Sequence, residues 1–590
     1  MFAFIPKTRD YEDYQIINRI EKSATDSTKH ICINFHPLEK KMYPDDIIDK
    51  TGVVIESPYL SKRDIPGILI TTGKTYGRVN KKGNNSKYYY KCIPNDKRLP
   101  CVLLPYQEKN PGFSKHKINL FVLFRLNAWT DKHPTGILNN VIGRVNDRIN
   151  YCDYELHCKN LAISLKNFTK SADKAIKKLN ELCQIESPDN SLEDRRDRYI
   201  FSIDPPETRD IDDAMGIITS RTIPASTTER TTISIYIANV PYWLSRLALW
   251  DFITMRPSTV YLPHTNINML PKKLSEDLIS LVENKDRVAF VMDIDINTTD
   301  STVTNISFTT AKINVTKNFS YEHNQLLKRQ EYKEILKITK GLHQKARQQA
   351  QQYKYVAEIR DSHDVVEYYM IMMNHMSAKK LYDYKCGVFR TVTTKTNTDA
   401  DNIVDKELAK FINIWKYTSS SYSLYDEHTG HDIVAGGIDK YAQITSPIRR
   451  LCDIVNMAEL QIHLGKLVET ESMRQTIDKI TNDIDNVNVL SKNIRKVQSS
   501  SKLLNYCLDI AQEDNIVEGY IIDSNDIIDG VKYTVYVPEL QLITKVTSAV
   551  EDRPENKKKY KQYEKYKFGV YVFTDEHSFH KKIRLSKYEN

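Results

Sequence analysis

The sequence predicts a multidomain protein in which β-rich regions flank a large α/β centre. Its 590 residues are enough for about four domains of ordinary size. From Thr51 to about Asn160, short apolar runs alternate with Gly and Asn turn signals, which is typical of small β-barrels, and we expect two. Between residues 198 and 465, strand-like and helix-like runs alternate, which favours one α/β domain. β signals return after Asn515.

The expected elements follow from hydrophobic periodicity. A helix is predicted over 171–185, because five apolar residues fall on one face: Ala172, Ala175, Ile176, Leu179 and Leu182. In the centre, apolar or alternating runs predict strands at 198–204, 231–240, 287–296 and 305–315. Longer apolar patterns predict helices at 364–383 and 446–464, followed by a mostly helical stretch over 468–512.

Composition excludes several classes of protein. Forty per cent of residues are apolar and the mean hydropathy is −0.51, which argues against a wholly disordered chain. No apolar run approaches the roughly 18 residues of a membrane span, and the N-terminal apolar stretch is too short for a signal peptide. The net charge of +9 suits a polyanionic partner without requiring one.

The cysteines and a lysine motif exclude two further kinds of site. Nine cysteines at irregular spacing, with no CxxC, argue against a zinc ribbon or a disulfide framework, so a reducing compartment is expected. Gly73-Lys74-Thr75 resembles the end of a phosphate-binding loop, but Gly67 lies one residue too far upstream. We therefore expect no nucleotide cofactor.

The strongest chemical signal is a cluster of carboxylates directly after a predicted strand. The segment SIDPPETRDIDDAMG holds four of them: Asp204, Asp210, Asp212 and Asp213. Such a cluster repels itself unless it takes up protons, pairs with arginine or binds cations, and hard oxygen ligands select Mg²⁺ or Mn²⁺. The spacing does not fit an EF-hand, since Arg221 stands where Glu is needed. A solvated acidic turn remains the alternative at this point.

A second signal is the segment YAQITSPIRRLCDIVN. Ser446 and Pro447 predict a helix start, which would place Arg449 and Arg450 in the first turn. Cations there oppose the helix dipole, so a bound anion such as phosphate would explain them. An ion pair between Arg449 and Asp453 is the alternative.

These motifs resemble those of a known family. SIDPPETRDIDDAM and TSPIRR resemble the two signatures of the ribonuclease II/ribonuclease R (RNB) family, and residues 258–290 resemble its middle segment. The phrase DRRDRYIFSIDPP is similar to the eukaryotic branch that includes the catalytic subunit of the RNA exosome. The resemblance runs from about Thr51 to the C-terminus. The first 50 residues are too few for the endonuclease domain of some exosome subunits.

The resemblance implies a domain layout. It implies two cold-shock (OB-like) barrels, a central α/β RNB catalytic domain and a C-terminal OB barrel of the S1 type. The expected boundaries are an N-terminal arm over 1–50, barrels over 51–110 and 111–190, the catalytic domain over 191–513 and the S1-like barrel over 514–590.

The resemblance also implies an activity: processive 3′→5′ hydrolysis of single-stranded RNA to nucleoside 5′-monophosphates. Asp204, Asp210, Asp212 and Asp213 would be the Mg²⁺ carboxylates, with Mn²⁺ as a substitute, and Asp212 the one most critical for catalysis. Arg449 would act on the phosphate. Further RNA contacts are expected from Tyr261, Tyr321, Arg450, Ser446 and Glu367. For the two tyrosines, core packing is the alternative, because the chain holds 36 tyrosines.

The sequence departs from the family pattern near these motifs. Glu207 replaces the usual glycine after the prolines, Gln443 a usual histidine, Leu451 a usual tyrosine and Met457 another histidine. These changes motivate a second hypothesis, a catalytically weak or inactive RNA-binding scaffold on the same fold.

Single-stranded RNA is the expected partner, together with other RNA-processing proteins and no membrane. Two tracts that mix lysine and tyrosine, at 81–91 and 557–567, suit single-stranded RNA, although each also fits a solvated loop. The expected location is the soluble interior of the cell, with the cytoplasm favoured over nucleus or organelle.

Overall fold

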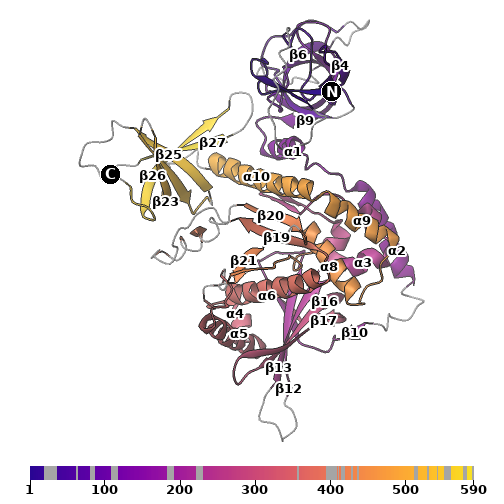
Figure 1. Cartoon of the computed structure of the whole chain (residues 1–590), viewed down its shortest axis with the longest axis vertical. Coiled ribbons are helices and arrows are strands. Elements are labelled where there is room, and N and C mark those ends of the chain that lie inside the picture. Colours follow the sequence, from indigo (N-terminus) through magenta and orange to yellow (C-terminus); the bar gives the residue numbers. More distant parts are fainter. Residues whose placement is uncertain are drawn as a thin grey trace. The chain divides into compact units, whose positions relative to one another are not determined.

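In the computed structural model, the chain forms two compact units. Figure 1 labels the helices and strands of the chain. One unit comprises residues 1–162, 262–264 and 496–590, and the other residues 163–261 and 265–495. The structure describes the chain apart from residues 19–35, 62–63, 80–86, 108–116, 183–191, 221–229, 355, 357, 394–404, 406–407, 409–410, 413–418, 427–429, 435–436, 510–515, 528–529, 541, 550–559, 576–580 and 588–590.

The first unit begins with two β structures. A four-stranded sheet with the order β2-β1-β3-β4 is built from β1 (Phe2–Pro6), β2 (Tyr14–Asn18), β3 (Ile47–Ile48) and β4 (Val54–Glu56). A closed barrel with the order β5-β6-β7-β9-β8 is built from β5 (Ile65–Leu69), β6 (Tyr88–Pro94), β7 (Val102–Tyr106), β8 (Leu120–Ala128) and β9 (Thr135–Arg144).

These strands correct the expected N-terminal boundaries. Residues 1–50 supply three strands of a sheet and are not an arm. The boundary at residue 110 falls inside the closed barrel, because β8 pairs with β5 across it. The region 145–182 holds α1 (Arg148–Cys158) and α2 (Lys166–Leu182) and not a barrel. Turn signals mark strand ends, but they do not say which strands close on one another.

The same unit ends in a five-stranded antiparallel sheet. Its order is β25-β24-β23-β26-β27, from β23 (Ile516–Ile527), β24 (Gly530–Val537), β25 (Leu542–Ala549), β26 (Lys565–Thr574) and β27 (Lys581–Lys587). Buried residues such as Val517, Val535 and Phe568 form its core. The return to β structure predicted after Asn515 is therefore confirmed.

The central unit is built on a seven-stranded sheet with the order β10-β17-β16-β13-β12-β11-β18. Its strands are β10 (Glu193–Asp194), β11 (Ile200–Asp204), β12 (Asp213–Ser220), β13 (Arg230–Ala238), β16 (Asp286–Asn297), β17 (Thr302–Asn314) and β18 (Lys317–Ser320). Short pairs form from β14 (Val260–Leu262) with β15 (Thr265–Ile267), β19 (Val388–Thr393) with β20 (Ser419–Leu424), and β21 (His431–Val434) with β22 (Gly437–Asp439).

Both faces of the seven-stranded sheet are covered, so its strands are apolar on both sides. Along β13, Ile233, Ile235 and Ile237 pack in one core, whereas Tyr236 and Ala238 pack in the other. The helices of this unit are α2, α3 (Val240–Arg246), α4 (Asn324–Lys328), α5 (Gln330–Gln348), α6 (Ser362–Asp383), α8 (Leu451–His463), α9 (Glu471–Asn482) and the first part of α10 (Ile484–Asp509).

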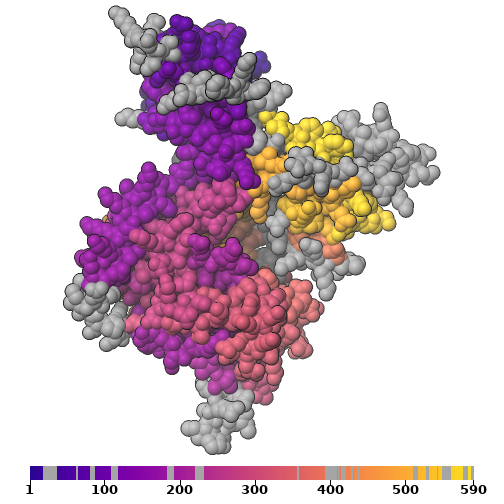
Figure 2. All heavy atoms as spheres, turned by 180° about the vertical axis from the view of Figure 1, so that it is seen from behind, coloured from indigo at the N-terminus to yellow at the C-terminus, as the bar shows by residue number. Residues whose placement is uncertain are grey.

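Helices α5 and α6 contribute to the core that contains Ile233, and α2, α3 and α9 to the core that contains Tyr236. Helix α8 contributes to both cores and is buried from Leu451 to Gln461. The space-filling view shows residues of this unit, coloured from purple through pink to salmon, packed closely against one another (Figure 2). The central α/β domain predicted from the alternation of strands and helices is thus confirmed.

Candidate active site

The four aspartates lie where two neighbouring strands meet their connecting loop. β11 ends at Asp204 and β12 begins at Asp213, and the strands pair antiparallel with Phe201 opposite Met215. This register places Asp204 and Asp213 at the same end of the sheet, so the sequence cluster is also a cluster in space. β18 runs parallel to β11 with Ser320 beside Asp204, which places Tyr321 just beyond Asp204.

The connecting loop is fixed by a serine that the sequence motifs do not reveal. The fully buried Ser280 hydroxyl accepts a hydrogen bond from the Ile211 amide at 2.9 Å and donates one to the Arg209 carbonyl at 2.7 Å. The Leu281 amide donates to the Ile211 carbonyl at 3.0 Å. The loop is therefore held by hydrogen bonds to a segment about 70 residues away in the sequence. Such bonds are typical of a preorganised site, in which the functional groups are already in position before a ligand binds.

Asp212 joins this loop to the arginine segment. Its side chain is buried, and its two oxygens accept from the Ile448 amide and from Arg449 Nε, both at 2.9 Å. Arg449 Nη2 also donates to Ser446 Oγ at 3.2 Å, while 45% of the Arg449 side chain stays exposed. Arg449 is thus anchored at one edge and open to solvent at the other.

The arginine segment is a turn and not the predicted helix start. Residues 447–449 form a turn, and α8 begins at Leu451 with Arg450 as its capping residue. The buried Asp453 accepts from the Ser446 amide at 2.8 Å and pairs with Arg450 Nη2 at 2.8 Å. Asp453 therefore forms its ion pair with Arg450 and not with Arg449, the alternative considered from the sequence. Arg449 pairs with Asp212 instead.

Burial and mutual repulsion make the aspartates difficult to ionise. Burial raises the pKa of Asp204 to about 6 and that of Asp212 to about 7, although the Arg449 charge opposes both shifts. The pKa of Asp210 is also raised, mainly by burial. Burial, with the neighbouring charges of Asp204 and Asp212, raises the pKa of Asp213 well above its usual range.

The donor set fits a divalent cation. Asp204 Oδ2 is buried without a hydrogen-bond partner, and carboxylate oxygens are the ligands that Mg²⁺ and Mn²⁺ prefer. The aspartates do not form a closed cage, however. Among the described residues, a tighter group of metal-ligand side chains lies away from the aspartates. It consists of Cys386, Glu459 and His463, whose donor atoms all lie within 4.8 Å of one another.

The predicted aromatic residues lie beside this cluster. Tyr261, on β14, donates to Asp210 Oδ2 at 3.4 Å, and burial together with the Asp210 charge raises its pKa to about 12. Tyr321 stacks on His363 with ring centroids 3.7 Å apart and planes 5° apart. The charges of Asp213, Asp204 and Glu367 add to burial in raising the pKa of Tyr321.

The structure therefore brings most of the predicted site residues together. The Arg449 charge acts on all four aspartates and on both tyrosines, and Glu367 of α6 is close enough to act on Tyr321. Ser446 and Arg450 differ, because both are engaged inside the protein by Arg449 and Asp453. Residues 81–86 and 557–559 of the two lysine–tyrosine tracts lie outside the described residues.

Asn374 on α6 is a second positioning residue that sequence reasoning missed. Its Oδ1 accepts from the Ile444 amide at 2.8 Å, and its Nδ2 donates to the Tyr441 hydroxyl at 3.1 Å and to Thr445 Oγ1 at 3.3 Å. It fixes the segment that leads into the Arg449 turn. The only sign of this role in the sequence is that Asn374 is a polar residue inside an apolar helical run.

Glu207 occupies a backbone conformation that favours glycine. Its φ is +66°, in the left-handed region where a side chain costs roughly 1 kcal/mol. The glycine expected at this position from the family pattern therefore has a physical reason.

We expect Glu207→Gly to stabilise the central unit by up to about 1 kcal/mol, since relief of this strain outweighs the entropy that glycine adds to the unfolded chain. The midpoint of thermal unfolding should rise by about 2 °C. Glu207→Ala, which keeps a Cβ, should leave the midpoint unchanged, and an equal rise in both variants would contradict a backbone cause.

Comparison with known proteins identifies a domain within the central unit. Residues 192–466 match the model of the RNB domain. A DIS3-like exonuclease 2 of Schizosaccharomyces pombe is 29% identical over 246 residues, covering 38% of this chain and 24% of the relative. A DIS3-like exonuclease 2 of Xenopus tropicalis is 22% identical, covering 92% of this chain and 75% of the relative.

Two solved structures share the fold. Mycoplasma genitalium RNase R, in complex with ribose-methylated single-stranded RNA, superposes with a TM-score of 0.65 at 17% identity, covering 90% of this chain and 91% of that one. Yeast Ssd1, described as a pseudonuclease, gives a TM-score of 0.58 at 16% identity, covering 84% of this chain and 66% of that one.

The sheet, the carboxylate cluster and the domain match together define an RNB-domain protein. The curated relatives that it resembles include DIS3-like exonucleases and an exosome exonuclease, so the chain is similar to the DIS3 branch of RNB-domain proteins. The family resemblance and the predicted fold class, with β-barrel and β-rich regions around a central RNB domain, are confirmed. The chain spans only about a quarter of the S. pombe relative's length.

Proposed function

We propose that the chain is a divalent-metal-dependent exoribonuclease that removes nucleoside 5′-monophosphates from the 3′ end of single-stranded RNA, one after another. The observation that carries this proposal is the meeting of four aspartates, one half-exposed arginine and two tyrosines around a buried, unpartnered carboxylate oxygen. The match of residues 192–466 to the RNB domain supports RNA as the substrate.

Asp204, Asp210 and Asp213 would hold Mg²⁺, with Mn²⁺ as a substitute. A bound ion of this kind lowers the pKa of water and neutralises phosphate charge. Asp212 differs from the other three in its partners, because it accepts hydrogen bonds from the Ile448 amide and from Arg449 Nε and so joins the acidic loop to the arginine segment. Its proposed role is to hold Arg449 in place, and removing it would disable catalysis through the arginine.

The remaining residues would bind the RNA end. Arg449 directs its exposed guanidinium edge at the phosphate, where a fixed positive charge stabilises developing negative charge. Tyr261 and the stacked pair Tyr321–His363 provide flat faces beside the reacting nucleotide, and base stacking tolerates any sequence. Glu367 would contact the same nucleotide. Ser446 and Arg450 would support Arg449 and the RNA path.

The partner proposed here is single-stranded RNA, with other RNA-processing proteins as further candidates. No helix among the described residues is long and apolar enough to cross a membrane. The cysteines that the structure describes form no disulfide with one another, and the setting proposed for the chain is the reducing cytoplasm.

The test is a degradation assay on a 5′-labelled RNA whose duplex carries a single-stranded 3′ overhang. With Mg²⁺, we expect the overhang to shorten from its 3′ end with no internal fragments, and the same RNA with a 3′ label to release mononucleotide at once. EDTA should stop the reaction, and restored Mg²⁺ should restart it. Early internal fragments, or equal rates in EDTA, would contradict the proposal.

An RNA-binding scaffold without nuclease activity is the second candidate. The strained Glu207 backbone beside the aspartates and the likeness to the Ssd1 pseudonuclease favour it. If the chain is such a scaffold, it should bind RNA in the presence of Mg²⁺ without degrading it. The half-life of the RNA should then be the same with the parent protein and with Asp212→Asn. The same degradation assay therefore separates the two functions.

A further inference from the structure

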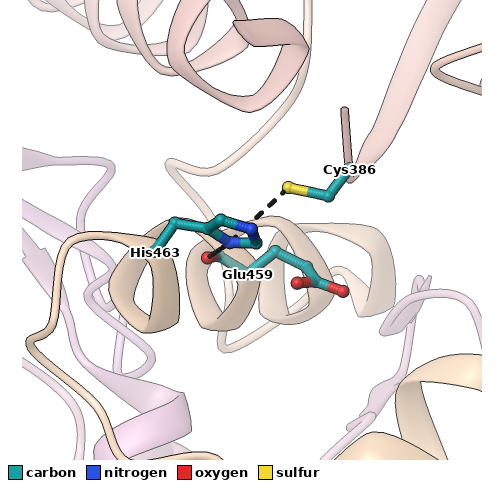
Figure 3. Close-up of side chains that lie close together, drawn as sticks. All are labelled: Cys386, Glu459 and His463. Atoms are coloured by element: carbon teal, nitrogen blue, oxygen red, sulfur yellow. Dashed lines mark hydrogen bonds between the residues drawn. The ribbon is translucent and has the colours of Figure 1, made fainter. Parts of the chain in front are cut away.

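A second group of ligand-type side chains lies in the central unit, and none of its members belongs to the carboxylate cluster. Cys386, Glu459 and His463 bring one thiol, one carboxylate and one imidazole together, with all donor atoms within 4.8 Å of one another (Figure 3). Glu459 and His463 are four residues apart on α8 and share one face of that helix. Cys386 comes from the turn between α6 and β19.

Each of the three side chains is held in place by the surrounding structure. The Cys386 amide donates to the Leu381 carbonyl at 3.1 Å, which fixes the turn that carries the thiol. The His463 ring stacks on Tyr384 with centroids 4.8 Å apart. Arg474 of α9 donates to the buried Glu459 carboxylate at 2.7 and 3.3 Å, and it also bonds Glu469.

The contacts inside the group suit a soft metal ion. Cys386 Sγ lies 3.9 Å from His463 Nδ1, close to the separation of two ligands on one tetrahedral centre. His463 Nδ1 also lies 2.9 Å from the Glu459 carbonyl, so an ion bound at Nδ1 would take the place of the proton in this contact, and the neutral ring would carry its proton on Nε2. His463 is exposed, which leaves a position for water.

We propose that Cys386, Glu459 and His463 form a zinc site that is independent of the aspartates. Zn²⁺ binds thiolate, imidazole and carboxylate ligands, and three such ligands leave its fourth coordination position open for water. Mg²⁺ does not favour sulfur ligands. Binding releases the Cys386 thiol proton to solvent, and the Arg474 hydrogen bonds orient the Glu459 carboxylate from behind. The ion would tie the turn before β19 to the C-terminal end of α8.

The decisive experiment is Co²⁺ titration of the full chain with Mg²⁺ in excess, so that the aspartates are occupied. The parent should bind one equivalent with the near-ultraviolet absorption of a thiolate–cobalt bond. Cys386→Ser should lose this absorption and bind Zn²⁺ at least about tenfold more weakly. Cys101→Ser, at a half-buried cysteine outside the group, should behave as the parent.

A second readout covers variants that fold poorly. Zn²⁺ at about one hundredfold above its Kd should raise the thermal midpoint of the parent by about 5 °C. The rise should disappear in His463→Gln, a change at an exposed helix end. A thiolate–cobalt band that persists in Cys386→Ser, or a midpoint that Zn²⁺ does not move in the parent, would overturn the zinc site. RNA hydrolysis with Mg²⁺ should persist in both variants.

Discussion

Asp213→Asn should lower the rate of RNA hydrolysis by about 10²–10³-fold while leaving RNA affinity nearly unchanged. The amide removes a negative ligand from the proposed cation site, and the loss of one electrostatic group at such a site costs roughly 10²–10³ in rate. RNA binding depends mainly on arginines, lysines and stacking, which stay in place. Single-turnover hydrolysis and filter binding on the same RNA measure the two effects.

The same variant should be at least as stable as the parent when Mg²⁺ is absent. Asp213 is buried beside Asp204 and Asp212, and these charges make its ionised form unfavourable, so a neutral amide removes repulsion. The matched control is Asp383→Asn, at the exposed end of α6, which should change neither rate nor stability. A variant that loses activity only because it unfolds would contradict the proposed role of Asp213.

Arg449→Lys should also lower the rate of hydrolysis by about 10²-fold or more. Arg449 donates hydrogen bonds from Nε to Asp212 and from Nη2 to Ser446, and part of its guanidinium group still faces solvent. A lysine ammonium is one compact charge and cannot make these contacts together. The RNA cleavage rate at saturating RNA measures this effect. A rate within threefold of the parent would exclude Arg449 as the phosphate ligand.

Removing the arginine charge should make stability more dependent on pH. The pKa of Asp212 is about 7 in the folded chain and about 3.9 when unfolded, so the folded state binds the extra proton between these values. The stability that this proton contributes is present below about pH 4 and is lost as pH rises through 7. In Arg449→Gln the folded pKa should rise further, so the variant's stability deficit should be larger at pH 8 than at pH 6.

Much of the central domain could be predicted from the sequence because each strand and helix carries its own periodic signal. The strand ending in Asp204 and the helix containing Glu367 lie where their apolar patterns indicate. The aspartates could be found because carboxylates so close in sequence need a cation, a proton or an arginine, and the structure supplies the arginine and leaves one oxygen unpartnered.

The rest depends on contacts between distant residues, which leave no local signal. Ser446 and Pro447 are good helix-start residues, but the Ser446 amide is taken by Asp453 and the Ile448 amide by Asp212, so the helix starts later. Ser280 and Asn374 position the site through bonds to loops that are far away in sequence. The strand pairing that closes the N-terminal barrel across residue 110 is equally non-local.

The bond between Asp212 and the Arg449 turn has a consequence during protein synthesis. The two partners are 237 residues apart, so a growing polypeptide carries the acidic loop long before its arginine has left the ribosome. Until then the nascent chain has the carboxylates without the arginine that pairs with Asp212. The proposed site can therefore assemble only after translation has passed the second motif.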